Sequence, residues 1–170
     1  MQHVRAAIDV MKCDASPALL DYLNLIRPHT LLVLGQRAVT CARDYQLAYP
    51  ECQTEGVTEP AKLSDKRFDA AIVLDCIEHL DKSSACQLIA RLRDTLAINL
   101  LIAVPLASGA PGVLSQWVDG DFLALGMQAH AQLKCEGGTL GLYRFAIHDY
   151  KSVPDWLNAK YWAHPARWVP

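Results

Sequence analysis

The sequence lacks any apolar run long enough to cross a bilayer, since runs such as those at residues 31–34 and 100–104 are far shorter than the roughly 20 residues that a spanning helix needs. The first fourteen residues lack the apolar core of a signal peptide. No cluster of basic residues occurs, and 16 Lys and Arg against 18 Asp and Glu leave a net charge of −2. The sequence therefore predicts a cytoplasmic protein with no membrane segment and no nucleic-acid partner.

Cysteine motifs are also missing. The six cysteines show no CxxC pair and no grouping with histidine at zinc-ligand spacing. Without a secretion signal, they are expected to be reduced thiols rather than a disulfide framework. They lie at positions 13, 41, 52, 76, 86 and 135.

What the sequence does contain is enough apolar material for one packed domain. Its 170 residues are 52% hydrophobic and 20% charged, which excludes a disordered chain. We expect a single domain over residues 1–170, with an N-terminal arm at 1–16 and an aromatic tail at 151–170. The tail holds three of the four tryptophans, which favours core closure or a homodimer contact, or alternatively the closing of a substrate pocket.

Buried strands and helices alternate along the chain. Three continuous apolar segments have the composition of strands that are covered on both faces. They lie at residues 30–35, 68–74 and 99–104. Apolar residues at helical spacing predict helices before, between and after the first two segments. These helices are expected near residues 17–27, 37–47 and 82–96, and a short strand is expected near residues 53–57.

The last part of the chain has a different period. Residues 129–136 alternate between apolar and polar, Gly137 and Gly138 form a tight turn, and residues 140–147 return as a second strand. The fold class predicted is therefore α/β, with an open, doubly wound, mostly parallel sheet and a C-terminal antiparallel hairpin. Ligands of such sheets bind at the carboxyl ends of the strands, where the strand order reverses.

This order resembles that of the class I S-adenosylmethionine (SAM) methyltransferases, which have a Rossmann-like fold. The similarity is carried by RFDAAIVLDCIEHLDKSSACQLIARLRDTL at residues 67–96, which resembles the family's strand followed by an acidic-x-x-Glu-His signature and a helix. Residues 121–127 resemble its late helix, and residues 138–147 its closing strand. The resemblance implies SAM as cofactor and a small molecule as methyl acceptor.

The glycine-rich cofactor loop of that family is degenerate here. Only Gly35 remains of a GxGxG pattern; Arg37 and Val39 stand where the family has glycine, and Val33 replaces its acidic residue. Arg37 still offers a charge-assisted contact to a carboxylate or phosphate. From Gly35 to the second buried strand there is room for one helix and one strand, so the sheet is expected to be shortened by one strand and one helix.

The resemblance assigns the cofactor contacts residue by residue. Gly35, Gln36 and Arg37 are the remains of the loop, Asp75 follows the second buried strand, and two acids are candidates further along. Glu59 is the candidate for the ribose hydroxyls, with Glu55 as an alternative register, and Asp65 is the candidate for the adenine.

The candidate catalytic residues are His79 and Glu78, since a hydroxyl acceptor needs a general base. Some O-methyltransferases hold a divalent metal with the side chains that correspond to Asp75, Glu78 and His79. The alternatives are pocket lining without a metal and plain turn chemistry between strand and helix. Two functions remain open: a methyltransferase acting on a small molecule, and an inactive methyltransferase fold that binds a ligand or a protein partner.

Overall fold

The computed structural model describes residues 13–106 and 112–150. Most of the predicted N-terminal arm and the whole aromatic tail lie outside the described residues. Six strands form one sheet in the order β2-β1-β3-β4-β6-β5. Strands β1 to β4 are parallel, and β6 and β5 are antiparallel to their neighbours. The strands are β1 (Thr30–Leu34), β2 (Gln53–Val57), β3 (Phe68–Leu74), β4 (Ala97–Leu106), β5 (Gln128–Cys135) and β6 (Gly138–Ala146).

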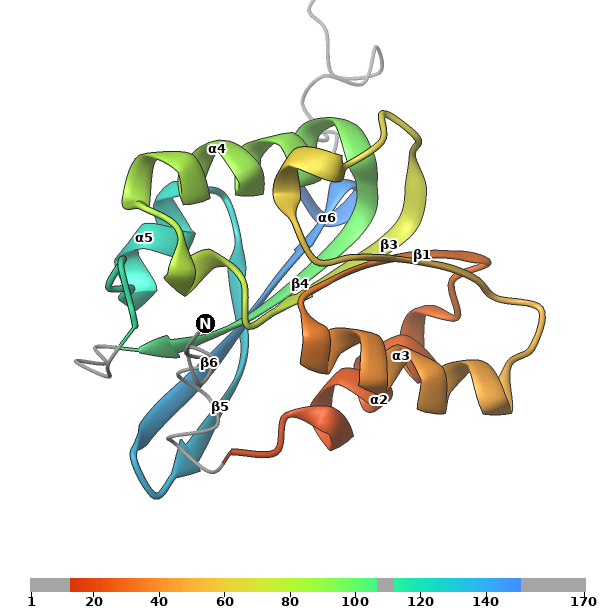
Figure 1. The fold of residues 1–170 in the computed structure, drawn as a ribbon, viewed down its shortest axis with the longest axis horizontal. Helices are drawn as coiled ribbons and strands as arrows, with labels where there is room; N and C mark the ends of the chain where they lie inside the picture. The colour runs from red at the N-terminus through yellow and green to blue at the C-terminus, as the bar shows by residue number, and fades with distance from the viewer. Residues whose placement is uncertain (1–12, 107–111, 151–170) are drawn as a thin grey trace, which may run out of the picture.

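Helices cover both faces of this sheet (Figure 1). Helices α2 (Ser16–Ile26) and α3 (Gln36–Ala48) pack on one face, where they enclose alternate residues of the strands such as Leu31 and Val33. The other face is covered by α4 (Lys82–Arg91), the π-helical turn η3 (Leu92–Leu96) and α5 (Asp119–Ala124), which enclose Leu32 and Leu34. Short 3₁₀ turns, η1 (Pro60–Lys62) and η2 (Ile77–His79), and helix α6 (Ile147–Tyr150) complete the described elements. None of the described helices has the length and apolarity that a membrane crossing requires.

The predicted doubly wound sheet with a C-terminal hairpin is confirmed. The chain runs from β1 outward to β2 and then returns to the other side of β1 as β3, so the strand order reverses between β1 and β3. The interval from Gly35 to β3 holds one helix, one strand and the turn η1, as the short spacing predicted. The crevice at the carboxyl ends of β1 and β3 is therefore the expected ligand position.

The prediction that all cysteines are reduced thiols is wrong for one pair. Cys13 and Cys135 form a disulfide across 122 residues of sequence. No local pattern signals this bond, because the two residues meet only when the segment before α2 packs beside β5. Cys41, Cys52, Cys76 and Cys86 are free thiols.

Candidate functional site

Gly35 lies at the carboxyl end of β1, packed against the end of β3. Its φ is +100°, and its amide donates to the Val57 carbonyl at 3.3 Å. A Cβ at this position would lie 1.7 Å from the Leu74 carbonyl oxygen, so the loop can approach β3 only as glycine. The glycine that the sequence retains is therefore the one that the packing of the two strands requires.

Helix α3 begins directly after Gly35, with Gln36 as its first residue. No side chain among the described residues caps this end of the helix. The first amides of a helix have no partner within it and carry partial positive charge, so this end suits an anionic or polar ligand group. Gln36 itself is exposed.

Arg37 links the segment before α2 to the residue that follows β3. Arg37 Nη2 donates to the Cys13 carbonyl at 2.6 Å, and Arg37 Nε lies 3.8 Å from Asp75 Oδ2. The side chain of Asp75 is only 5% exposed and that of Arg37 is 30% exposed. Asp75 also has a left-handed backbone with a φ of +55°, which is uncommon for a residue other than glycine and is frequent at functional sites.

The other side chain that replaces a family glycine does not face this crevice. Val39 packs against β2, where a Cβ added to Gly56 would lie 3.2 Å from Val39 Cγ2. The glycine at position 56 therefore makes room for Val39 between helix and strand. Of the two substitutions in the loop, only Arg37 reaches Asp75 at the edge of the sheet.

The structure separates the two acids that the resemblance suggested for the cofactor. Glu59 follows the end of β2 by two residues, at the same edge as Gly35, and its 62% exposed carboxylate pairs with Lys62 at 3.1 Å. Asp65 lies three residues before β3 begins and pairs with Arg91, the last residue of α4, at 2.8 Å. The carboxyl edge thus brings together Glu59 and Gly35 but not Asp65.

Glu78 is fully buried, unlike any other carboxylate that the structure describes. Its Oε2 accepts the Cys76 amide at 3.0 Å, and among the described residues Oε1 has no hydrogen-bond partner. Burial, together with the nearby charge of Asp75, raises the pKa of Glu78 to about 7. The backbone carbonyl of Glu78 accepts the amides of Leu114 and Ser115 at 2.8 and 3.2 Å, so Glu78 also fixes the loop that follows β4.

His79 lies beside that loop with a defined tautomer. Its Nδ1 lies 3.0 Å from the Gly112 carbonyl oxygen. A carbonyl can only accept, so in this contact Nδ1 carries the proton, and in a neutral ring Nε2 is then the acceptor. This arrangement suits a general base.

The side chains predicted as metal ligands are not brought together in the described part of the chain. No three His, Cys, Asp or Glu side chains in this part of the chain are placed to hold a metal ion. Glu78 turns into the core toward the Cys76 amide, while His79 is bound to Gly112. Asp75, Glu78 and His79 are neighbours in sequence whose side chains do not converge on one point.

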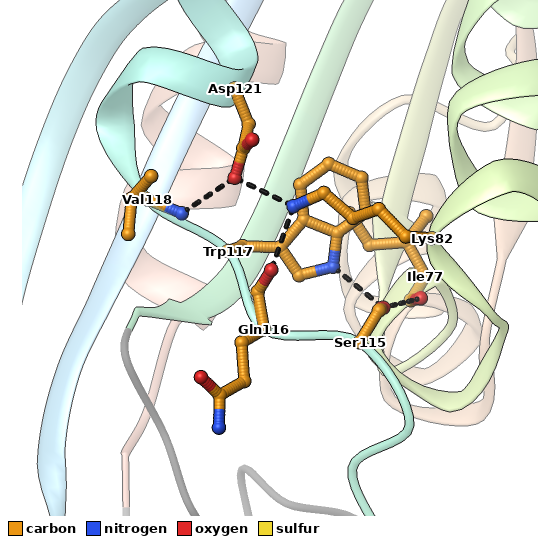
Figure 2. Close-up of polar contacts among 7 residues, drawn as sticks. All are labelled: Ile77, Lys82, Ser115, Gln116, Trp117, Val118 and Asp121. Atoms are coloured by element: carbon orange, nitrogen blue, oxygen red, sulfur yellow. Dashed lines mark hydrogen bonds and ion pairs between the residues drawn. The ribbon is translucent and has the colours of Figure 1, made fainter.

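A polar and aromatic cluster, made of Lys82, Ser115, Trp117 and Asp121, anchors the loop after β4 (Figure 2). Lys82 Nζ lies 3.7 Å from the centroid of the buried Trp117 ring and donates to Asp121 Oδ2 at 2.6 Å and to the Gln116 carbonyl at 2.7 Å. Trp117 Nε1 donates to Ser115 Oγ, which in turn donates to the Ile77 carbonyl, both at 2.9 Å. This cluster holds the loop in place beside η2, which carries His79.

Sequence reasoning missed this cluster. Lys82 follows the helix cap Asp81, whose Oδ1 accepts the Ser84 amide at 3.0 Å, and nothing in its position along the chain signals a contact with Trp117. Trp117 directly follows residues 105–116, whose glycine, proline and serine content is typical of a loop. Their contact joins residues 35 positions apart, and no periodic signal links them.

Comparison with known proteins gives a family and a fold. The sequence model of a family of unknown function (DUF6231) matches residues 14–169. No curated protein matches the sequence significantly.

Three solved structures with a similar fold are distant in sequence. Magnesium protoporphyrin IX methyltransferase from Synechocystis PCC 6803, with bound S-adenosylhomocysteine (SAH), has a TM-score of 0.55 at 14% identity, over 85% of this chain and 87% of that one. An N-methyltransferase from Bradyrhizobium japonicum WM9 has a TM-score of 0.55 at 14% identity, over 81% and 96%. The 1,6-didemethyltoxoflavin-N1-methyltransferase of Burkholderia thailandensis, with its substrate and SAH, has a TM-score of 0.53 at 15% identity, over 84% and 80%. At such identities the likeness shows a methyltransferase-like fold.

Proposed function

The chain belongs to DUF6231, a family of unknown function, and we propose that it is a SAM-dependent methyltransferase acting on a small molecule. The observation that carries this proposal is His79, held with Nε2 as the proton acceptor at the carboxyl edge of a methyltransferase-like sheet. Two of the structural neighbours contain SAH, and magnesium protoporphyrin IX methyltransferase also has a structure with SAM.

Part of the crevice fits such a cofactor. Gly35 and the uncapped amides at the start of α3 suit a polar or anionic group. Arg37 supplies a cation for the carboxylate of the methionine moiety. Glu59, exposed at the same edge, is an acceptor for hydroxyl groups of the ribose. These residues are the ones that we assign to cofactor binding.

The chemistry that the chain itself must supply is positioning and proton removal. Bound SAM provides a methyl group that is already activated on sulfur. His79 Nε2 accepts the proton of a hydroxyl acceptor as the methyl group is transferred. Glu78 is close enough to His79 for the charge of the imidazole to lower the pKa of Glu78, against the larger effect of burial. Glu78 is fully buried and acts through His79 and the loop rather than on the substrate.

Calorimetric titration with SAM and SAH tests the cofactor half of the proposal. We expect micromolar affinity for SAH, weakened by Arg37→Gly and by Glu59→Gln. Asp65→Asn is the matched control, because Asp65 is paired with Arg91 away from the crevice, and its affinity should equal that of the wild type. The absence of heat at millimolar SAH would retire the enzyme proposal.

The contacts of Arg37 favour a second candidate, a non-catalytic methyltransferase fold that serves as a binding module. The guanidinium group joins the Cys13 carbonyl to Asp75 across the degenerate loop, and so links the N-terminal segment to the end of β3. If Arg37 serves only to link these two segments, we expect that neither the wild type nor Arg37→Gly binds SAH. The same titrations therefore distinguish the two candidates.

A further inference from the structure

The disulfide between Cys13 and Cys135 joins two segments that are 122 residues apart in the sequence. Cys13 precedes α2, and Cys135 ends β5, the edge strand of the sheet. Their Cα atoms are 5.3 Å apart, within the range that a disulfide requires. The bond therefore fixes the segment at residues 13–15 against the C-terminal hairpin.

The segment at residues 13–15 is also hydrogen-bonded to Arg37, near the carboxyl ends of β1 and β3. The carbonyl of Cys13 accepts the 2.6 Å hydrogen bond from Arg37, whose Nε lies 3.8 Å from Asp75. A hydrogen bond to a charged donor is among the stronger ones in proteins. The disulfide thus anchors the residue whose carbonyl accepts the hydrogen bond from Arg37.

The two sulfurs differ in their surroundings. Cys13 is buried, with 6% exposure, whereas Cys135 is half-buried at the end of an edge strand, beside the hairpin turn. A reductant therefore reaches the bond from the side of Cys135. Among the free cysteines, burial raises the pKa of Cys41 to about 11 and that of Cys76 to about 12, so these thiols are poor nucleophiles for exchange with the disulfide.

We propose that the Cys13–Cys135 bond is a reversible redox clasp that determines whether Arg37 is held by the N-terminal segment or is available to a ligand in the crevice. A thiolate of a protein dithiol reductant attacks the sulfur of Cys135 and forms a mixed disulfide, and Cys13 leaves as a thiolate that takes up a proton. The second thiol of the reductant then displaces Cys135, so the reductant leaves as a disulfide and the chain gains two thiols. The effect on SAH rests on the proposed function; the control of Arg37 does not.

The direct test measures Arg37 itself. The oxidised protein, the protein reduced with dithiothreitol and the Cys135→Ser variant are labelled with phenylglyoxal, and each arginine is followed by peptide mass spectrometry. Labelling of Arg37 is expected to be on the order of tenfold faster in both open forms, which corresponds to the loss of about 1.4 kcal/mol of protection. Arg91, paired with Asp65 elsewhere, is the internal reference, and Cys86→Ser is the control for removing a cysteine outside the clasp.

Several results would overturn the clasp. One is the alkylation of all six cysteines when the oxidised protein is denatured without a reductant. The structure requires that only the four free cysteines react. Another is an Arg37 labelling rate that is equal in the oxidised and reduced forms. SAH calorimetry on both forms is expected to show tighter binding after reduction, and equal binding would overturn the control of ligand access. If neither form binds SAH while Arg37 labelling still responds to reduction, the proposed function fails and the clasp is supported.

Discussion

Replacing Glu78 by glutamine is expected to stabilise the protein at neutral and alkaline pH and to leave its stability in acid almost unchanged. Glutamine keeps an oxygen for the Cys76 amide but cannot ionise. Glu78 is fully buried, and its pKa lies at about 7 against an ordinary value of 4.5. The native state therefore retains a proton on Glu78 between these two pH values, whereas the unfolded state has lost it.

The sign and size of the effect follow from this difference. Since the native state binds more protons in this window, the free energy of unfolding of the wild type falls as the pH rises from about 4.5 to about 7. Each pKa unit corresponds to about 1.4 kcal/mol, so the loss is about 3 kcal/mol once the pH exceeds the native value. Because glutamine does not ionise, the free energy of unfolding of Glu78→Gln does not fall in this way as the pH rises.

Urea unfolding, followed by tryptophan fluorescence, measures the difference between variant and wild type. The buried Trp117 provides a reporter in the same part of the core as Glu78. We expect nearly equal stability at about pH 4 and an advantage of about 3 kcal/mol for the variant at about pH 8. Glu59→Gln, which removes an exposed carboxylate, controls for the change in net charge. A constant separation of the Glu78→Gln and wild-type curves across this range would refute the reasoning.

Three further changes test other parts of the structure. Gly35→Ala should lower the free energy of unfolding by about 2–4 kcal/mol in the same urea assay, because a Cβ would meet the Leu74 carbonyl at a positive φ; unaltered stability would contradict the packing of β1 on β3. Lys82→Met should cost about 1 kcal/mol, because it removes the half-exposed pair with Asp121 and the bond to the loop, and hydrogen exchange at residues 113–118 should become faster. Cys135→Ser should lower stability by about 2–4 kcal/mol relative to the oxidised wild type, and the difference should vanish when both are reduced.

The predicted fold was recoverable because it depends on local signals. The buried strands at residues 30–34 and 68–74 are mainly apolar segments that end before Gly35 and Asp75, and such segments occur where both faces of a sheet are covered. The change to alternation after residue 128 marks the hairpin. These patterns determine element types and order, and the order itself restricts the sheet to few topologies.

The candidate site was recoverable in position but not in detail. The ends of β1 and β3 follow from the topology, so Gly35, Asp75 and His79 were expected at one edge. In the sequence, Arg37 and Val39 both stand where the resembled family has glycine. In the structure, Val39 packs against Gly56, and only Arg37 reaches Asp75. Which way a side chain turns depends on space left by distant residues.

By itself, the sequence determined the strands and helices, their order, and the edge of the sheet at which a ligand would bind, since hydrophobic periodicity and turn residues act over short distances along the chain. Only the tertiary structure decided that Cys13 meets Cys135, that Arg37 reaches the Cys13 carbonyl and that Glu78 is buried. Each of these depends on residues or segments that packing brings together, and no local pattern records such contacts.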